Sequence, residues 1–147
     1  MKSLWQEDVR QELKDRLARL TPETPRLWGR MTASQMTAHV ANTLRSATGD
    51  LPVASKKLPL RFTPLKQLMI YWLPIPKNVP TAPELISRPP KALTEEQADV
   101  CALIDQFERL SRSKVWPDHA AFGSMSGRDW AVLMYRHTDH HLRQFGV

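Results

Sequence analysis

Residues 126–146 read SGRDWAVLMYRHTDHHLRQFG, and this stretch decides the fold that we expect. Its apolar side chains recur every three or four positions, which is the period of an α-helix with one buried face. Ser126 followed three residues later by Asp129 is typical of a helix start. At 100° per residue, His137 and His141 fall near the middle of the apolar face. The sequence therefore predicts an amphipathic helix that buries two histidines.

The spacing of His137 and His141 indicates a shared metal ion. Side chains four positions apart on a helix lie one above the other, roughly 5–6 Å apart at Cβ. Zinc-binding helices use this spacing to give two imidazoles to one ion. A single core histidine more often bonds to a carbonyl or a water. Two stacked imidazoles in an apolar face need partners, because unpaired buried polar groups are costly, and a metal satisfies both.

His39 is the expected third ligand. It lies on a helix that we expect to begin at the capping box Thr32-Ala33-Ser34-Gln35 and to stop at Gly49. It borders the apolar face of that helix, so the three rings converge if the two helices are neighbours. Three histidines leave a coordination position open, which is the catalytic rather than the structural pattern. Zinc is the first choice of ion, with nickel or iron as alternatives.

Two further long helices complete an all-α fold. One is predicted from Ser3 to Leu20, and one from Thr94, where Thr94-Glu95-Glu96-Gln97 matches a second capping box. Between the second and third long helices lies a connector, residues 50–93, which holds nine of the twelve prolines. The expected architecture is thus a four-helix bundle with a long Pro-rich crossover between helices two and three.

The connector is expected to carry one short helix from Pro64 to about Leu73, with Thr63 as its cap and Pro64 at its first position. A connector this long is unusual inside a compact domain, so we expect it to cover something. Tyr71 and Trp72 are predicted to roof the pocket. The apolar residues of this short helix need an apolar surface to lie on; they are Leu65, Leu68, Met69 and Trp72.

Length and composition narrow the function classes. The 147 residues are expected to form a single domain, 1–147, and the lone Cys101 excludes an internal disulfide and favours a reducing compartment. The net charge of +6 permits anionic partners, but the basic residues are mixed with acids and lack aromatic interleaving, so no nucleic-acid binding is expected. No apolar stretch is long enough to span a bilayer. We expect a cytoplasmic protein that does not bind membranes.

The remaining histidines have weaker signals. His140 lies about 80° from the centre of the apolar face. It could support the ligands, replace one of them or lie on the surface. His119 follows a turn at Trp116-Pro117-Asp118 and could face the pocket mouth, although a loop histidine is more often solvated. Asp139 points to the opposite side of the helix and is not expected to act as a base.

Two segments resemble the DinB-like superfamily, and within it a subfamily of unknown function with a C-terminal HHLRQFG-type motif. The first runs from Trp28-Gly29-Arg30-Met31-Thr32 into His39, and the second from Phe122-Gly123 through Trp130 to the motif at residues 140–146. The resemblance implies a bundle in up-down-down-up order, with a metal triad at His39, His137 and His141. It also implies kinship with metal-dependent enzymes that use small thiols, and the superfamily often forms homodimers.

Two classes of function follow. The first is a metal-dependent enzyme, a hydrolase or a small-thiol S-transferase, acting on a small-molecule substrate such as a low-molecular-weight thiol. The second is a non-catalytic protein that binds a metal or a small ligand. A third reading keeps the histidines as core residues without a metal. No glycine-rich phosphate loop, paired CxxC motif or nucleophile elbow is present in the sequence.

Overall fold

The protein is described by a computed structural model over residues 1–56, 58–110 and 115–147, and within these ranges it is all-α. Five α-helices and two 3-10 turns, η1 and η2, are present: α1 (Glu7–Leu17), α2 (Ala33–Thr48), η1 (Pro59–Arg61), α3 (Leu65–Tyr71), η2 (Pro83–Ile86), α4 (Leu93–Arg109) and α5 (Gly127–Gln144). The all-α expectation is confirmed. The helix beyond the expected four long ones is α3, which lies in the Pro-rich connector.

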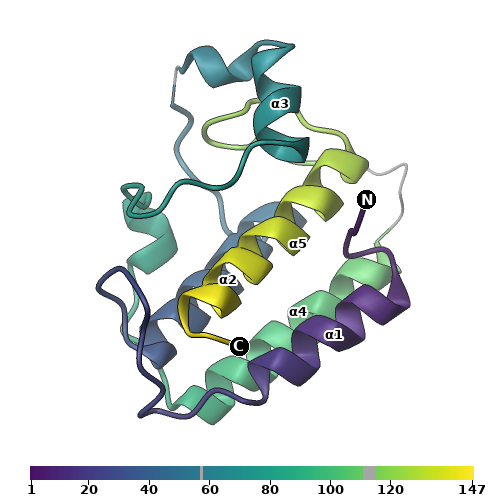
Figure 1. Cartoon of the computed structure of the whole chain (residues 1–147). Helices are drawn as coiled ribbons and strands as arrows, with labels where there is room; N and C mark the ends of the chain where they lie inside the picture. The colour runs from purple at the N-terminus through teal and green to yellow at the C-terminus, as the bar shows by residue number, and fades with distance from the viewer. Residues whose placement is uncertain (57, 111–114) are drawn as a thin grey trace.

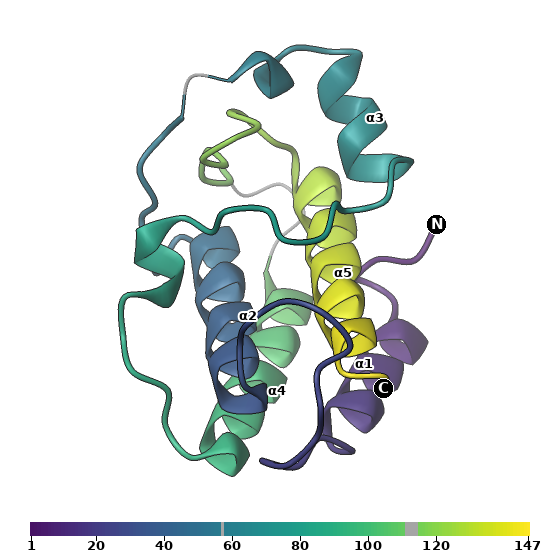
Figure 2. The same cartoon turned by 60° about the vertical axis from the view of Figure 1, so that its left-hand side comes forward.

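The long helices pack in pairs around one core. α2 contacts both α4 and α5, and α1 contacts the same two helices. Figures 1 and 2 show α1, α2, α4 and α5 side by side, with α3 set apart at the N-terminal end of α5. Large side chains from all four long helices fill the space between them; they include Leu13, Met36, Ile104, Phe107, Trp130 and Met134.

The helix ends that position the histidines are as predicted. The Thr32 side chain accepts the backbone N–H of Gln35, and the Gln35 side chain accepts the backbone N–H of Thr32. Ser126 and Asp129 form the same reciprocal box at the start of α5. Gly49 ends α2 with φ of 94°, a left-handed conformation that favours glycine.

The predicted bounds of two other helices were wrong. α1 runs from Glu7 to Leu17 rather than from Ser3 to Leu20, and ahead of it the backbone N–H of Leu4 donates to the Ala131 carbonyl of α5. α3 begins at Leu65, with Pro64 as its cap residue and no side-chain cap, so the cap assigned to Thr63 is not formed.

The second capping box was also wrong. α4 begins at Leu93 with Ala92 as its cap and makes no side-chain cap hydrogen bond. The carboxylate of Glu96 is fully buried. It accepts two hydrogen bonds from the Arg88 guanidinium, at 2.5 and 2.6 Å, and one from the backbone N–H of Lys91. Burial acts to raise the pKa of Glu96, but these hydrogen bonds outweigh it and hold the pKa below its usual value. Long-range partners thus outcompete the local cap.

Polar contacts with α5 fix the inner side of α3. Tyr71 donates its hydroxyl to the Asp129 carboxylate at 2.6 Å. Arg136 of α5 donates to the carbonyl oxygens of Met69, Ile70 and Leu73, at the C-terminal end of α3. The Ile70 side chain is buried in the core. These contacts leave the opposite side of α3 facing outward.

No helix in the described part of the chain is long and apolar enough to cross a membrane.

The Arg88–Glu96 pair generates a stability prediction. Arg88→Met leaves the Glu96 carboxylate buried without its charged partner, so we expect the free energy of unfolding to fall by about 3–5 kcal/mol. The double variant Arg88→Met/Glu96→Met should recover most of this loss, because no buried charge remains. Urea denaturation of the four proteins of this double-mutant cycle measures both effects. A single variant as stable as the wild type would contradict the pairing.

Candidate metal centre

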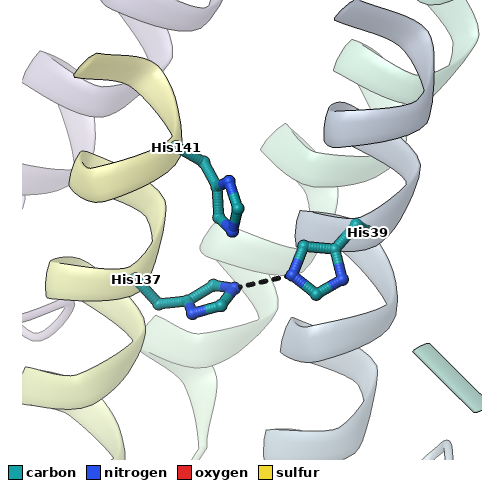
Figure 3. Close-up of side chains that lie close together, drawn as sticks. All are labelled: His39, His137 and His141. Carbon is teal, nitrogen blue, oxygen red and sulfur yellow. Dashed lines mark hydrogen bonds between the residues drawn. The ribbon is translucent and has the colours of Figure 1, made fainter. Parts of the chain in front are cut away.

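Three histidines from α2 and α5 meet between these helices. Each of His39, His137 and His141 offers one ring nitrogen, and these three nitrogens all lie within 4.8 Å of one another. Figure 3 shows the two α5 rings one above the other, facing the ring of His39 across the gap. The ring centroid of His39 lies 5.1 Å from that of His137 and 4.9 Å from that of His141, and the two α5 rings are 4.6 Å apart. The structure therefore brings together the three residues that spacing and periodicity select.

The closest contact in the triad joins one ring nitrogen of His39 to one of His137. The Nε2 atoms of His39 and His137 are 3.0 Å apart, so only one of them can carry a proton and donate it to the other. A tetrahedral ion with metal–nitrogen bonds of 2.0–2.1 Å places its ligands about 3.3 Å apart. Small side-chain rotations therefore suffice for both rings to hold one ion.

His39 is also incompletely bonded on its other side. Its Nδ1 atom is buried and makes no hydrogen bond with the described residues. The backbone carbonyl of Leu85 in η2 is nevertheless near enough to raise the pKa of the ring somewhat. A proton on Nδ1 would face this carbonyl and leave the Nε2 lone pair directed at the other histidines, as in many metal sites.

All three imidazoles are neutral at pH 7. Burial lowers the pKa of His39 to about 3 and that of His141 to about 4, and nearby imidazoles add to the effect on His39. Burial, followed by the neighbouring histidines, holds the pKa of His137 well below its usual value. Neutral imidazole is the form that binds a metal. The set of donors thus fits a divalent ion without prior deprotonation.

Gln144 sets the orientation of His141, and sequence reasoning missed this role. Its Oε1 atom lies 2.8 Å from Nδ1 of His141, and its Nε2 atom donates to the Trp28 carbonyl at 2.8 Å. Because the second bond identifies which end of the amide is the donor, Nδ1 of His141 must carry the proton. Its Nε2 lone pair is then free for a metal. The three-residue spacing of His141 and Gln144 on one helix face was the available signal.

The loop before α2 is shaped to accept Gln144. Gly29 has φ of 80°, and a Cβ atom placed on it would lie 2.4 Å from Nε2 of Gln144. The backbone N–H of Leu27 donates to the Gln144 carbonyl at 2.7 Å. Glycine is therefore needed at position 29 both for its conformation and for the close approach.

The secondary candidates lie in different places. His140 is half-buried, with its ring edge-on to those of His141 and Trp28, at 5.3 and 5.7 Å. His119 is packed against Trp130 at 5.2 Å, and its Nδ1 accepts the backbone N–H groups of Ala121 and Phe122. It belongs to the loop scaffold rather than to the triad. Asp139 faces away and pairs with Arg16 and Arg143, as expected.

The roof predicted for Tyr71 and Trp72 is not found at the cavity beside His39. The Trp72 side chain is 74% exposed on the outer side of α3, and Tyr71 is bonded to Asp129. An open cavity of about 600 Å³ lies beside His39, between α2 and residues 85–90. Among its lining residues are Arg30 and Arg88, and no carboxylate. The later part of the connector, which sequence reasoning did not single out, forms its wall.

One comparison with known proteins identifies a relationship. The family model of the DinB superfamily matches residues 7–145. No curated protein and no solved structure gives a significant match to the chain.

The Gln144–His141 bond predicts an effect on metal affinity. Gln144→Leu removes the acceptor that holds the proton on Nδ1 of His141, so we expect affinity for zinc to fall by about 10- to 100-fold. Gln144→Glu keeps an acceptor oxygen and should retain more of the affinity. Competition titration with a chromogenic chelator measures this, with Gln11→Leu on the exposed side of α1 as control. Equal affinity in folded Gln144→Leu protein would contradict the assignment.

The buried ring of His119 predicts a pH dependence of stability. Burial lowers its pKa to about 4 from 6.5, so between these pH values the unfolded chain binds the proton and the folded protein does not. The stabilising contribution is complete above about pH 6.5 and is lost as the pH falls toward 4. His119→Asn keeps an acceptor for the two N–H groups but cannot titrate.

Urea denaturation between pH 7 and 5 tests this expectation. The His119→Asn variant should lose stability less steeply on acidification than the wild type, by up to about 1.4 kcal/mol per pH unit. Above pH 7 the two proteins should show the same pH dependence. Identical slopes below pH 6 would mean that His119 does not titrate on unfolding.

Proposed function

The chain belongs to the DinB superfamily, and on that premise we propose that it is a metal-dependent enzyme, a hydrolase or a small-thiol S-transferase. The observation that carries the proposal is the meeting of His39, His137 and His141 at one point between α2 and α5. We extend the proposal to the family's up-down-down-up helix order, which is compatible with α1 and α2 each packing against both α4 and α5.

The three imidazoles would be the protein ligands of the ion, for which zinc is the first choice and nickel or iron the alternatives. A donor set made only of nitrogen is compatible with all three. When bound, such an ion acts as a Lewis acid and lowers the pKa of a water or a thiol. Three protein ligands leave room for such a group.

The chain's own residues have separate tasks in this proposal. Gln144 holds the proton on Nδ1 of His141 and so keeps Nε2 available. The cavity beside His39 would accept the small-molecule substrate, and its volume of about 600 Å³ is in the range of small-molecule sites. Arg88 in its lining is paired with Glu96, so Arg30 is the lining cation that would favour a substrate with a negatively charged group. A low-molecular-weight thiol with a carboxylate satisfies these requirements.

The alternative function is a protein that binds a metal or a small ligand without turnover. One observation favours it. The carboxylate nearest to the ligands in sequence, Asp139, is engaged by Arg16 and Arg143 and faces away from the histidines. An enzyme of this site would therefore depend on the metal, on the histidines or on the substrate itself for proton transfer. Substrate binding without product formation, in the presence of metal and thiol, would favour the alternative.

Metal content is the first test. Tag-free protein should contain about one zinc, nickel or iron ion per chain by elemental analysis, and His137→Ala/His141→Ala should contain none, because the variant removes two of three ligands. His140→Ala removes a neighbouring imidazole outside the triad and should keep the ion. Stoichiometric metal in the double variant would contradict the site.

Thermal unfolding provides an independent measurement. An ion that binds only the folded protein stabilises it by about 2.7 kcal/mol at 100 times its dissociation constant. We expect this gain in the wild type and in His140→Ala, and no gain in the double variant. A wild type that neither contains nor takes up metal would remove the basis for the enzyme proposal. We also propose a cytoplasmic location, in keeping with the reduced state expected for the lone Cys101.

A further inference from the structure

The outer side of α3 is an apolar surface that the described chain does not cover. Leu65, Leu68 and Trp72 follow one another at helical spacing on the side of α3 that faces away from the buried Ile70. Phe62 precedes the helix and is 73% exposed, and Trp72 is 74% exposed. We call these four residues the α3 surface. The apolar support that the sequence predicts for Leu65, Leu68 and Trp72 is not supplied by the described residues.

Along the sequence, the segment that carries this surface has charges of one sign. Between Asp50 and Glu84 the chain has five basic residues and no acidic residue; they are Lys56, Lys57, Arg61, Lys66 and Lys77. The whole chain has 21 basic and 15 acidic residues, so the rest of it has 16 against 15. Almost all of the net charge of +6 is therefore located in the segment that contains α3.

Charged side chains of neighbouring elements also lie against this segment. From α5, Arg128 lies over the ring of Tyr71, 5.9 Å from its centroid. Asp129 is buried and accepts the Tyr71 hydroxyl. Two exposed acids contact the segment in the described residues: Asp118 lies 3.7 Å from Arg61, and Glu84 accepts the backbone N–H of Ala54 and interacts with Lys56. The α3 surface is thus apolar and aromatic and belongs to a basic segment, of which Lys77 lies over the Trp28 ring, 4.3 Å from its centroid.

The position of α3 makes the surface accessible to a flat partner. Both views show α3 and the preceding loop at one end of the molecule, beyond the N-terminal end of α5 (Figures 1 and 2). The inner side of α3 is fixed by Arg136 and Tyr71, so the exposed side chains are presented from an anchored helix.

We propose that the α3 surface binds the interface of an anionic lipid membrane. Tryptophan and phenylalanine are well suited to the boundary between headgroups and acyl chains, and basic residues beside them are attracted to anionic lipids. A second copy of the chain is a poorer partner, because a symmetric contact through this surface would bring two basic segments together. The association is peripheral, needs no membrane-spanning helix and does not depend on the metal. It revises the expectation of no membrane contact.

Vesicle co-sedimentation tests the proposal. Full-length protein should bind vesicles of phosphatidylcholine with about 30% phosphatidylserine, but not phosphatidylcholine alone, and binding should weaken as salt is raised. Phe62→Ala and Trp72→Ala should each weaken binding by about tenfold, because each removes an inserted ring. Leu27→Ala is the matched control, since Leu27 is 66% exposed on the loop before α2. Thermal unfolding should show that all variants remain folded.

Charge variants separate the electrostatic part. Lys56→Gln/Lys57→Gln removes two charges from the segment and should lower binding to anionic vesicles. Arg19→Gln/Arg109→Gln removes two charges from the turn after α1 and the last residue of α4, and should leave binding unchanged. Absence of binding at low salt, or equal binding by Trp72→Ala and wild type, would overturn the proposal. So would a dimer in light scattering that dissociates in Trp72→Ala, which would assign the α3 surface to a second copy.

Discussion

Three imidazole rings between α2 and α5, two of them buried and that of His137 partly buried, are the constraint on which the rest of the structure depends. Each ring brings two polar nitrogens into a region where water is scarce, and an unpaired buried nitrogen costs free energy. The structure satisfies some of these atoms with protein groups, as in the bond from His141 to Gln144. It leaves Nδ1 of His39 without a hydrogen bond among the described residues, and it brings the Nε2 atoms of His39 and His137 within 3.0 Å of each other. An ion shared by the Nε2 atoms would satisfy them without a proton between the rings.

The loop before α2 and the end of α5 are hydrogen-bonded to each other beside the ring of His141. Gln144 bonds through its side chain to both His141 and the Trp28 carbonyl, and through its backbone to Leu27. Gly29 makes the contact possible because no side chain occupies the position of the Gln144 amide. Two segments that are more than a hundred residues apart in sequence therefore determine the tautomer of one histidine. The orientation of a ligand is in this sense a property of the whole fold.

The Pro-rich connector has two parts with different structural roles. Its later part, with η2 and residues 85–90, lies along α2 and forms the wall of the cavity beside His39. Its earlier part, with α3, is held by α5 and turns an apolar side outward. The same Pro-rich segment thus encloses the site and presents a separate surface. A bundle with short loops would have neither feature.

The sequence by itself determined the all-α class, the starts of α2 and α5, and the choice of His39, His137 and His141 as candidate ligands, because all of these depend on local periodicity, spacing and capping. It did not determine the start of α4, because Glu96 bonds to Arg88 and Gln97 donates to the carbonyls of Leu17 and Leu20, and such long-range partners leave no local pattern. It did not show which side of α3 is buried, since that helix is apolar on two sides. Only the tertiary structure decided that Ile70 faces the core while Trp72 faces outward, and that Gln144 supports His141, because both depend on which distant segments pack together.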